Sequence, residues 1–339
     1  MTPLFAFRYT HQIVNMEITR LKVRVDSLRD EAQGIRSFSI SRLDGLPFDT
    51  YEPGAHIDVT SPAGITRQYS LCGDPERRDA QIFAVKKEQA SRGGSRSLHD
   101  EVVAGMELSV STPRNLFQLA SQASEHILIA AGIGITPLLS MAYRLLRQRA
   151  RFKLHYFARS PEQAAFLSQL CASPFAEHVE VHLQVPRDAL DQRLHACISK
   201  VEDGAHLYTC GPAPFMERVV HVAGDYLPEE AIHLERFGAQ QNVTASGSGR
   251  SDTFEVRLAK TGASIEVKSG QTIVDALAQI GIEVDTSCGE GVCGTCMVSV
   301  VDGEPEHRDH CLSKAERASN SVICCCVSRS LSPVLILDL

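Results

Sequence analysis

The stretch Cys288-Gly-Glu-Gly-Val-Cys293-Gly-Thr-Cys296 places three cysteines at C-x4-C-x2-C spacing near the end of a 339-residue chain. This is the plant-type spacing for a [2Fe–2S] cluster, which is held by four cysteine thiolates. The glycines between the cysteines permit positive φ angles, so that backbone amides can turn toward the sulfurs. Zinc or purely structural cysteines are the alternatives, but zinc sites usually pair two short cysteine knuckles. We therefore predict a [2Fe–2S] cluster on this loop.

The fourth ligand of the cluster has several candidates. Cys324, Cys325 and Cys326 are consecutive, and chemistry alone permits any of them, whereas Cys311 is a weaker candidate. Seven of the eleven cysteines follow position 287, and the N-terminal residues do not resemble a secretory signal. Clustered cysteines in such a chain indicate metal or redox chemistry rather than disulfides.

Composition and charge exclude two broad classes of function. The net charge of −7 argues against a general nucleic-acid binder, which would be basic. Residues 127–146 are apolar over nearly the length of a membrane span, but glycines and a proline interrupt them. That stretch favours a buried strand, a tight turn and a helix with proline at its start. We expect no nucleic-acid or membrane partner.

The rhythm of apolar residues divides the chain into domains. Short alternating runs over residues 16–116 predict a small antiparallel β-barrel. Strand-like runs alternate with helix-like segments over 117–237, which predicts a parallel sheet covered on both faces. Residues 238–252 are polar and are expected to form a linker, and 253–339 form a third unit around the cysteine loop. Residues 1–15 are interpreted as an N-terminal extension.

Two turns in the middle unit follow strand-like runs and open helices. These turns are G-I-G-I-T-P at 132–137 and C-G-P at 210–212. Elsewhere in the same unit, residues 161–170 are expected to form a further helix. A glycine turn at a helix start presents backbone N–H groups to a pyrophosphate, although the full G-x-G-x-x-G pattern is absent. Two such turns in one parallel sheet are expected to border a nucleotide crevice. Buried turns without a ligand are the alternative.

Two motifs of the first unit suit a phosphate and a flat ring. R-Q-Y-S at 67–70 combines an arginine, an aromatic ring and a hydroxyl on one strand-like run. R-G-G-S-R at 92–96 offers glycine amides, a hydroxyl and two guanidinium groups, which is typical of an anion-binding nest. Taken alone, each motif equally suits an ordinary strand or a solvated loop.

The chain resembles the phthalate dioxygenase reductase family, in which the same motifs occur in the same order: R-x-Y-S, G-x-G-x-T-P, C-G-P and the cysteine loop. The resemblance extends from about residue 16 to residue 339. These proteins are the reductase components of Rieske non-haem iron oxygenases. The resemblance implies an antiparallel flavin-binding β-barrel, an α/β NAD domain with a parallel sheet, and a C-terminal β-grasp ferredoxin domain of the plant type. It also implies FMN rather than FAD, together with NADH and a [2Fe–2S] cluster.

The resemblance also assigns residues to the three cofactors. The flavin-binding positions would be Arg67, Tyr69, Ser70, Gly93, Gly94 and Ser95. The family also has an H-x-E-x-F element, which matches His233, Glu235 and Phe237 here, and Phe237 would be the residue that covers the flavin ring. The nucleotide turns would contribute Gly132, Gly134 and Gly211, with Thr136 and Cys210 bordering the nicotinamide. The last cluster ligand of the family follows the third after 29 intervening residues and precedes x-S-R, which selects Cys326.

The chemistry of the cofactors orders them. NADH releases two electrons as a hydride, whereas iron centres accept one at a time, so a flavin belongs between them. We expect electrons to pass from NADH through FMN and the cluster to a terminal Rieske oxygenase acting on an aromatic acid or methoxylated aromatic. Alternatives are a reductase for a haem or di-iron oxygenase, and a redox-sensing ferredoxin-like module, which the flavin motifs disfavour. We further expect a cytoplasmic monomer.

Nucleotide preference is a point where residue chemistry and resemblance differ. Arg159 and Ser160 follow a strand where the adenine ribose is expected, and the first acid beyond them is Glu162. An acid at this place is typical of NAD sites and an arginine of NADP sites, so the residues alone favour NADPH. The resemblance favours NADH, and NADH is our prediction.

Overall fold

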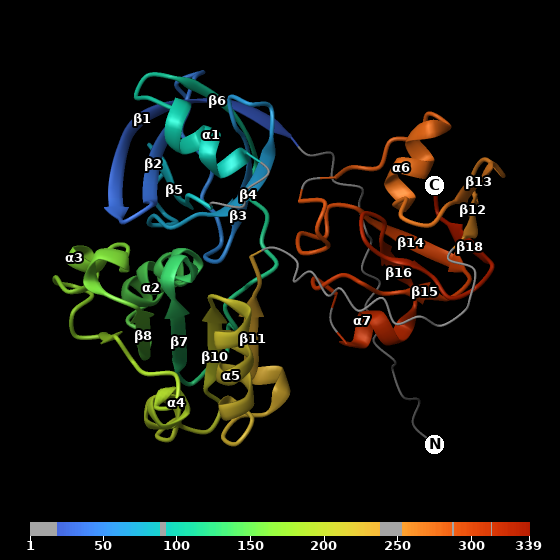
Figure 1. Ribbon diagram of the computed structural model, residues 1–339. Coiled ribbons are helices and arrows are strands. Elements are labelled where there is room, and N and C mark those ends of the chain that lie inside the picture. Colours follow the sequence, from blue (N-terminus) through green and yellow to red (C-terminus); the bar gives the residue numbers. More distant parts are fainter. Residues whose placement is uncertain (1–18, 89–92, 238–252, 287, 313) are drawn as a thin grey trace, which may run out of the picture.

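The computed structural model describes residues 19–88, 93–237, 253–286, 288–312 and 314–339. Its strands form, in chain order, a six-stranded sheet, two five-stranded sheets and a two-stranded sheet (Figure 1). The extension expected at 1–15 and the linker expected at 238–252 lie outside the described residues. The exact boundaries between the three domains stay predictions.

The first sheet is an antiparallel barrel with the strand order β4-β3-β6-β1-β2-β5. An antiparallel bridge between Leu71 and Phe83 joins its two ends and closes it. Alternate side chains point inward, and Phe38, Ile57 and Phe83 are fully buried. Its elements are β1 (Arg20–Ala32), β2 (Ile35–Arg42), β3 (His56–Thr60), β4 (Thr66–Ser70), β5 (Gln81–Lys86), α1 (Gly94–Glu101) and β6 (Glu107–Ser111).

The second sheet is parallel throughout, with the order β11-β10-β7-β8-β9. Helix α2 packs on one face and helices α4 and α5 pack on the other, each around its own apolar core. The predicted parallel sheet covered on both faces is therefore confirmed. Its elements are β7 (His126–Ala131), α2 (Ile135–Gln148), β8 (Phe152–Ala158), α3 (Leu167–Leu170), β9 (Val179–Leu183), α4 (Leu190–Ile198), β10 (His206–Cys210), α5 (Ala213–Ala223) and β11 (Ile232–Glu235).

One helix prediction in this domain is wrong. The segment 161–170 is not a single helix but a 3-10 turn, Pro161–Gln163, followed by the short helix α3. Between them Ala164 and Ala165 are buried, and Phe166 adopts a left-handed φ of 59°. The three apolar side chains join the core beneath α2, and this packing outweighs the local preference for helix.

The apolar stretch over 127–146 is divided as expected. It contains β7, a 3-10 turn at Gly132–Gly134 and most of α2. Over the described ranges, no helix is long and apolar enough to cross a membrane.

The third domain has the strand order β13-β12-β18-β14-β16, with β12 and β18 parallel at its centre. Helix α6 begins with a capping box between Thr272 and Asp275 and buries Ile273 and Leu277 against the sheet. This arrangement confirms the predicted β-grasp domain. Its elements are β12 (Phe254–Leu258), β13 (Ser264–Val267), α6 (Ile273–Gln279), β14 (Met297–Asp302), β15 (Pro305–Glu306), α7 (Lys314–Ser319), β16 (Val322–Cys324), β17 (Arg329–Ser330) and β18 (Val334–Leu337).

The ferredoxin-like domain contacts the rest of the molecule near its cysteine loop. Lys314 of α7 forms an ion pair with Glu229, which precedes β11. A Cβ built on Gly294 would lie 3.5 Å from Leu116 Cδ1, in the segment that follows the barrel. The cysteine loop therefore faces the junction of the other two domains.

Candidate functional site

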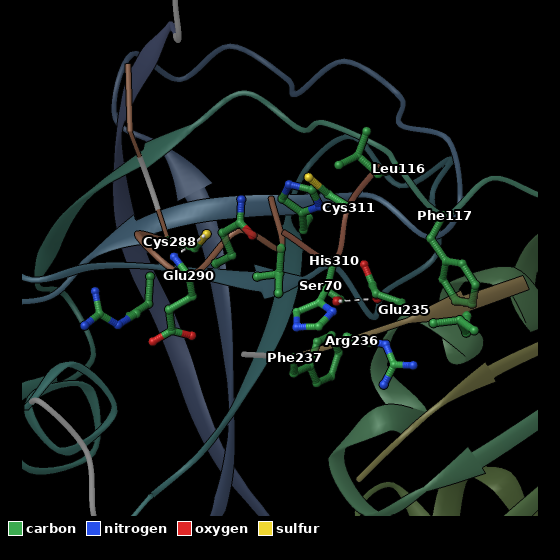
Figure 2. A pocket seen from close by; sticks show the side chains of 15 residues that line it. Ser70, Leu116, Phe117, Glu235, Arg236, Phe237, Cys288, Glu290, His310 and Cys311 are labelled. Atoms are coloured by element: carbon green, nitrogen blue, oxygen red, sulfur yellow. Dashed lines mark hydrogen bonds between the residues drawn. The ribbon is translucent and has the colours of Figure 1, made fainter. Parts of the chain in front are cut away.

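A pocket lies where the three domains meet (Figure 2). Its walls come from the barrel, from the segment after β6, from the end of β11 and from the cysteine loop. The lining residues include His56, Arg67, Gln68, Ser70, Leu116, Phe117, Leu234, Glu235, Arg236, Phe237, Cys288, Glu290, Val292, His310 and Cys311.

Three of the predicted flavin residues line this pocket. Arg67 and Ser70 come from β4, and Phe237 follows β11 with 45% of its surface exposed. The Ser70 hydroxyl donates a hydrogen bond to Glu235 Oε2 at 3.2 Å (Figure 2). The barrel and the nucleotide domain are thus joined at the place where the ring of a flavin is expected.

Tyr69 points away from this pocket. Its ring packs against the barrel core, 5.7 Å from the ring of Phe83, and burial raises the pKa of its hydroxyl to about 12. Ser70, the next residue along β4, faces the opposite side of the strand and lines the pocket.

The G-G-S segment lies beside the strand that carries Arg67. Gly93 has a φ of 109° and directly precedes helix α1. A Cβ built on Gly94 would lie 3.2 Å from Arg67 Cγ. The Ser95 hydroxyl accepts a hydrogen bond from the backbone N–H of Glu88. An arginine next to the start of a helix is a favourable environment for a phosphate.

The two predicted nucleotide turns touch each other. Strands β7 and β10 are parallel neighbours, so the turns that follow them meet at one edge of the sheet. A Cβ on Gly134 would lie 2.2 Å from the carbonyl oxygen of Cys210, and one on Gly211 would lie 2.9 Å from Ala131 Cβ. Only glycine allows this close approach. Gly132 has a φ of 57°, and its carbonyl accepts a hydrogen bond from Tyr156.

The two residues predicted to border the nicotinamide are both buried. Thr136 is 1% exposed, and its hydroxyl donates to the carbonyl of Ile133 at 3.0 Å. Cys210 is 0% exposed and lies opposite Glu235 in the pairing of β10 with β11. Burial and then the Glu235 carboxylate raise the pKa of the Cys210 thiol well above its ordinary value.

Glu235 is a site residue to which sequence reasoning gave no role of its own. Burial raises the pKa of its carboxyl to about 8, and the hydrogen bond from Ser70 partly opposes this rise. The side chain therefore holds a proton at neutral pH, between Ser70 and Cys210. An acid at the end of the short strand Ile-His-Leu-Glu was the available signal.

Arg159, the residue that favours NADPH, follows the end of β8 and is exposed. The Glu162 carboxylate interacts with the Ser160 hydroxyl, and this contact lowers the pKa of the glutamate.

Thiols from the cysteine loop and from the chain after β16 converge. Cys288 interacts with Cys293 and Cys326, and Cys296 also interacts with Cys326. Cys324 contacts Cys296 but otherwise faces Cys311, with 3.2 Å between their sulfurs. Of the consecutive cysteines, Cys326 is therefore the one placed beside two loop thiols.

The backbone of the loop suits a charged cluster. The N–H of Glu290 donates to Cys288 Sγ at 3.3 Å, and the N–H of Thr295 donates to Cys293 Sγ at 3.5 Å. Gly289, Gly291 and Gly294 have φ angles of 66°, 70° and 67°. These are the positive angles expected from the sequence, and they turn amides toward the sulfurs, where they stabilise thiolate charge. The residues present fit a [2Fe–2S] cluster.

A closed antiparallel barrel, a parallel nucleotide sheet and a cysteine-loop domain that share one pocket define an electron-transferring reductase. Residues 256–330 match the family model "2Fe-2S iron-sulfur cluster binding domain". Residues 106–231 match the model for the dimethylamine monooxygenase subunit DmmA-like, N-terminal domain. The first match lies within the third domain, and the second begins at the last strand of the barrel and covers most of the nucleotide domain.

Relatives extend the similarity to most of the chain. A vanillate O-demethylase oxidoreductase of Pseudomonas sp. (strain HR199 / DSM 7063) is 41% identical over 94% of this chain and 100% of that protein. The phthalate dioxygenase reductase of Burkholderia cepacia is 36% identical over 94% and 97%. A solved phthalate dioxygenase reductase superposes with a TM-score of 0.69 at 35% identity, covering 94% of this chain and 98% of that one.

The chain therefore belongs to the phthalate dioxygenase reductase family. Membership confirms the predicted oxidoreductase class, the three-part fold and the cofactor set of FMN, NADH and a [2Fe–2S] cluster. It also confirms that the chain is the reductase component of an oxygenase system. The roles predicted for individual residues stay predictions.

Proposed function

We propose that this chain delivers electrons from NADH, through FMN and then its [2Fe–2S] cluster, to a Rieske-type terminal oxygenase that acts on an aromatic acid or methoxylated aromatic. One observation carries the proposed route. Arg67, Ser70 and Phe237, which are expected to contact the flavin, line the same pocket as Cys288, an expected cluster ligand. Cofactors held by residues of one pocket would be near enough to each other to exchange electrons directly.

When bound, FMN supplies the conversion between a two-electron donor and one-electron acceptors. In the proposed mechanism, Arg67 and the start of α1 hold the phosphate, because a guanidinium and helix N–H groups both favour negative charge. Phe237 is exposed beside the pocket, so it can cover the ring and move aside for a nicotinamide. Burial keeps Glu235 protonated, and the hydrogen bond that Ser70 donates to Oε2 fixes the orientation of its carboxyl group.

The turns after β7 and β10 are proposed to receive the nucleotide. Their glycines let the backbone approach a pyrophosphate closely, and the contact of Gly134 with Cys210 sets the two turns at one crevice. The thiols of Cys288, Cys293, Cys296 and Cys326 are proposed to hold the cluster. The amides of Glu290 and Thr295 would then tune its reduction potential.

The names of the relatives support the proposed substrate class of the acceptor oxygenase, since vanillate and phthalate are aromatic acids. A second acceptor class is favoured by a different observation. An intact type IV self-sufficient cytochrome P450 monooxygenase superposes with a TM-score of 0.83 at 34% identity, over 94% of this chain and 41% of that one. A haem-containing oxygenase of the cytochrome P450 type is therefore the second candidate for the electron acceptor. Reconstitution with a Rieske oxygenase and with a cytochrome P450 in parallel distinguishes the two.

The order of the cofactors is tested by removing the last one. A chain ending at Gly238 is expected to reduce ferricyanide with NADH but not cytochrome c or an oxygenase. Full-length Cys288→Ser is the matched control, because it keeps every domain and removes one expected ligand. Equal cytochrome c reduction by the shortened chain would refute the proposed order. We also propose that the protein is cytoplasmic and that it is a monomer. Sedimentation of the holoprotein tests the monomeric state.

A further inference from the structure

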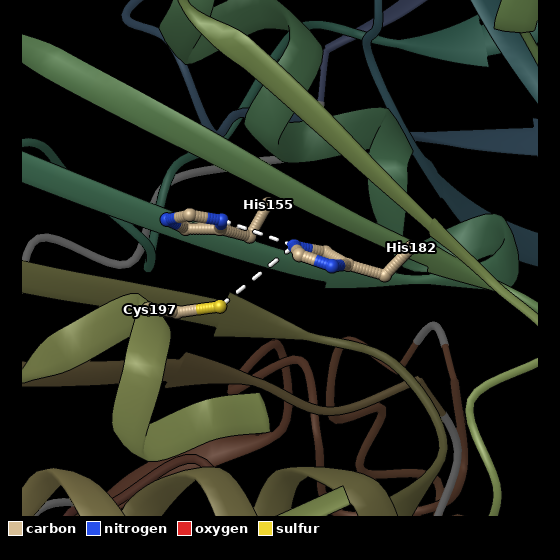
Figure 3. Close-up of side chains that lie close together, drawn as sticks. All are labelled: His155, His182 and Cys197. Carbon is tan, nitrogen blue, oxygen red and sulfur yellow. Dashed lines mark hydrogen bonds between the residues drawn. The ribbon is translucent and has the colours of Figure 1, made fainter. Parts of the chain in front are cut away.

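A second group of metal-ligating side chains lies in the nucleotide domain, apart from the pocket (Figure 3). His155 of β8, His182 of β9 and Cys197 of α4 place their ligand atoms within 4.8 Å of one another. His155 Nδ1 lies 3.1 Å from His182 Nε2, and Cys197 Sγ lies 3.7 Å from the same nitrogen. Neither the family resemblance nor the proposed electron route uses these residues.

The fold brings these three side chains together for identifiable reasons. In the parallel pairing of β8 with β9, His155 lies opposite Glu180 and Phe157 lies opposite His182. Alternate residues share a face of a strand, so both histidines point to the same side of the sheet. Helix α4 covers that side through Leu194 and Ile198, which are buried in the same core as Phe157. Cys197 lies next to them on the helix and therefore faces the histidines.

A fourth ligand is available from the same strand pair. The Glu180 carboxylate lies 3.7 Å from His155 Nδ1 and 3.7 Å from His182 Nε2. Its side chain is 56% exposed, whereas those of His155 and His182 are 6% and 4% exposed. The carboxylate thus closes the group on its solvent side and marks the route by which an ion enters.

We propose that His155, His182, Cys197 and Glu180 bind a zinc ion. In a tetrahedral zinc site the ligand atoms are about 3.4 Å apart for two nitrogens and about 3.6 Å apart for nitrogen and sulfur. The observed separations of 3.1 Å and 3.7 Å are close to these values, so small side-chain movements complete the site. Imidazole and thiolate ligands disfavour Mg²⁺ and Ca²⁺.

Charge and protonation are consistent with this ion. One thiolate and one carboxylate neutralise a divalent cation, which removes most of the cost of burying it. A thiol that coordinates zinc is deprotonated, so zinc binding must release the proton of Cys197, and affinity should increase with pH.

The position of the group indicates a structural role. His155 lies in the middle of β8, whereas the nucleotide turns follow the ends of β7 and β10. Strand β9 is at the edge of the sheet. An ion bound here would fasten α4 and the edge strand to the centre of the domain, without taking part in electron transfer.

The test uses the full-length holoprotein with its flavin and iron–sulfur cluster in place. After exposure to ZnCl₂ and gel filtration with a competing chelator, we expect about one zinc per chain in addition to iron. X-ray absorption at the zinc edge should show one sulfur and three nitrogen or oxygen ligands. The melting temperature should rise with Zn²⁺ but not with Mg²⁺.

Variants locate the ion. Cys197→Ser and His182→Gln should lose the bound zinc, and Glu180→Gln, a change at an exposed side chain, should weaken zinc binding about tenfold or more. Cys171→Ser is the matched control, since this cysteine is exposed in the same domain and should have no effect. Absence of zinc from the wild-type protein would overturn the proposal. Unchanged zinc in Glu180→Gln and His182→Gln, or coordination by sulfur alone as expected in the ferredoxin loop, would also overturn it.

Discussion

Gly291 and Gly289 provide a paired test of how the cysteine loop is packed. Both have left-handed φ angles, 70° and 66°, so alanine at either position should cost about 1–2 kcal/mol in backbone strain. A Cβ on Gly291 would lie 2.5 Å from Val327 Cγ2 and 3.0 Å from Asp309 Cα, whereas one on Gly289 meets nothing within 4 Å. Asp309 Cα belongs to the backbone and cannot rotate away.

The expected difference between the two variants follows from this contact. Overpacking in a well-packed region costs about 1–3 kcal/mol, and only Gly291→Ala incurs it. That difference corresponds to about 5- to 150-fold in the equilibrium for opening the loop. The Gly291 carbonyl also accepts a hydrogen bond from the N–H of His310 at 2.7 Å, so displacement of the loop disturbs a second segment.

Iron release to a chelator in mild urea measures this opening. Gly291→Ala should release iron faster than Gly289→Ala by the factor above. Both should keep NADH-dependent ferricyanide reduction, because Arg67, Ser70 and Phe237, the pocket residues expected to contact the flavin, are unchanged. Equal rates of iron release in the two variants would refute the argument. They would show that backbone strain alone, without the contacts to Val327 and Asp309, determines how readily the loop opens.

The remaining predictions concern ligands, flavin, protonation and nucleotide. Cys326→Ser should purify with little cluster and Cys324→Ser with a normal one; the reverse iron contents would show that the fourth ligand is misassigned. Arg67→Ala should purify flavin-poor, because loss of a charge-assisted phosphate contact costs about 1.5–3 kcal/mol; release of FAD from the wild-type protein on heating would contradict the FMN assignment. The pKa of Glu235, about 8 in the folded chain, exceeds the ordinary glutamate value of about 4.3. The stabilising contribution of protonated Glu235 is therefore complete below about pH 4.3 and is lost as the pH rises to about 8. The free energy of unfolding of the flavin-free chain should accordingly fall, relative to that of Glu235→Gln, between these two pH values. A difference between the two unfolding free energies, measured in urea, that stays constant with pH would count against the raised pKa. At one ionic strength kcat/KM should favour NADH over NADPH, and the opposite ratio would make Arg159 the next residue to replace.

The sequence predicted the elements whose signals are local. The strand, glycine turn and helix over 127–146 appear as β7, the 3-10 turn and α2, because apolar periodicity and turn residues act within a few positions. The helix expected over 161–170 failed because burial of Ala164, Ala165 and Phe166 depends on α2, a partner distant in sequence. Local propensity does not contain that contact.

The candidate site shows the same division. Motif order was sufficient to select Arg67 and Ser70, and both line the pocket. Tyr69, from the same motif, packs against Phe83 instead. The raised pKa of Glu235 arises from burial between strands of different domains, which no motif expresses.

The sequence by itself determined the cofactor class, because three cysteines at fixed spacing and glycines at strand ends are properties of short segments. The family spacing already selected Cys326, and only the tertiary structure places Cys326 beside Cys288 and Cys288 in one pocket with Ser70 and Phe237. These relations join residues far apart in the chain. They follow from how the apolar cores of the three domains meet, and that arrangement is set by the summed burial of many side chains rather than by any one motif.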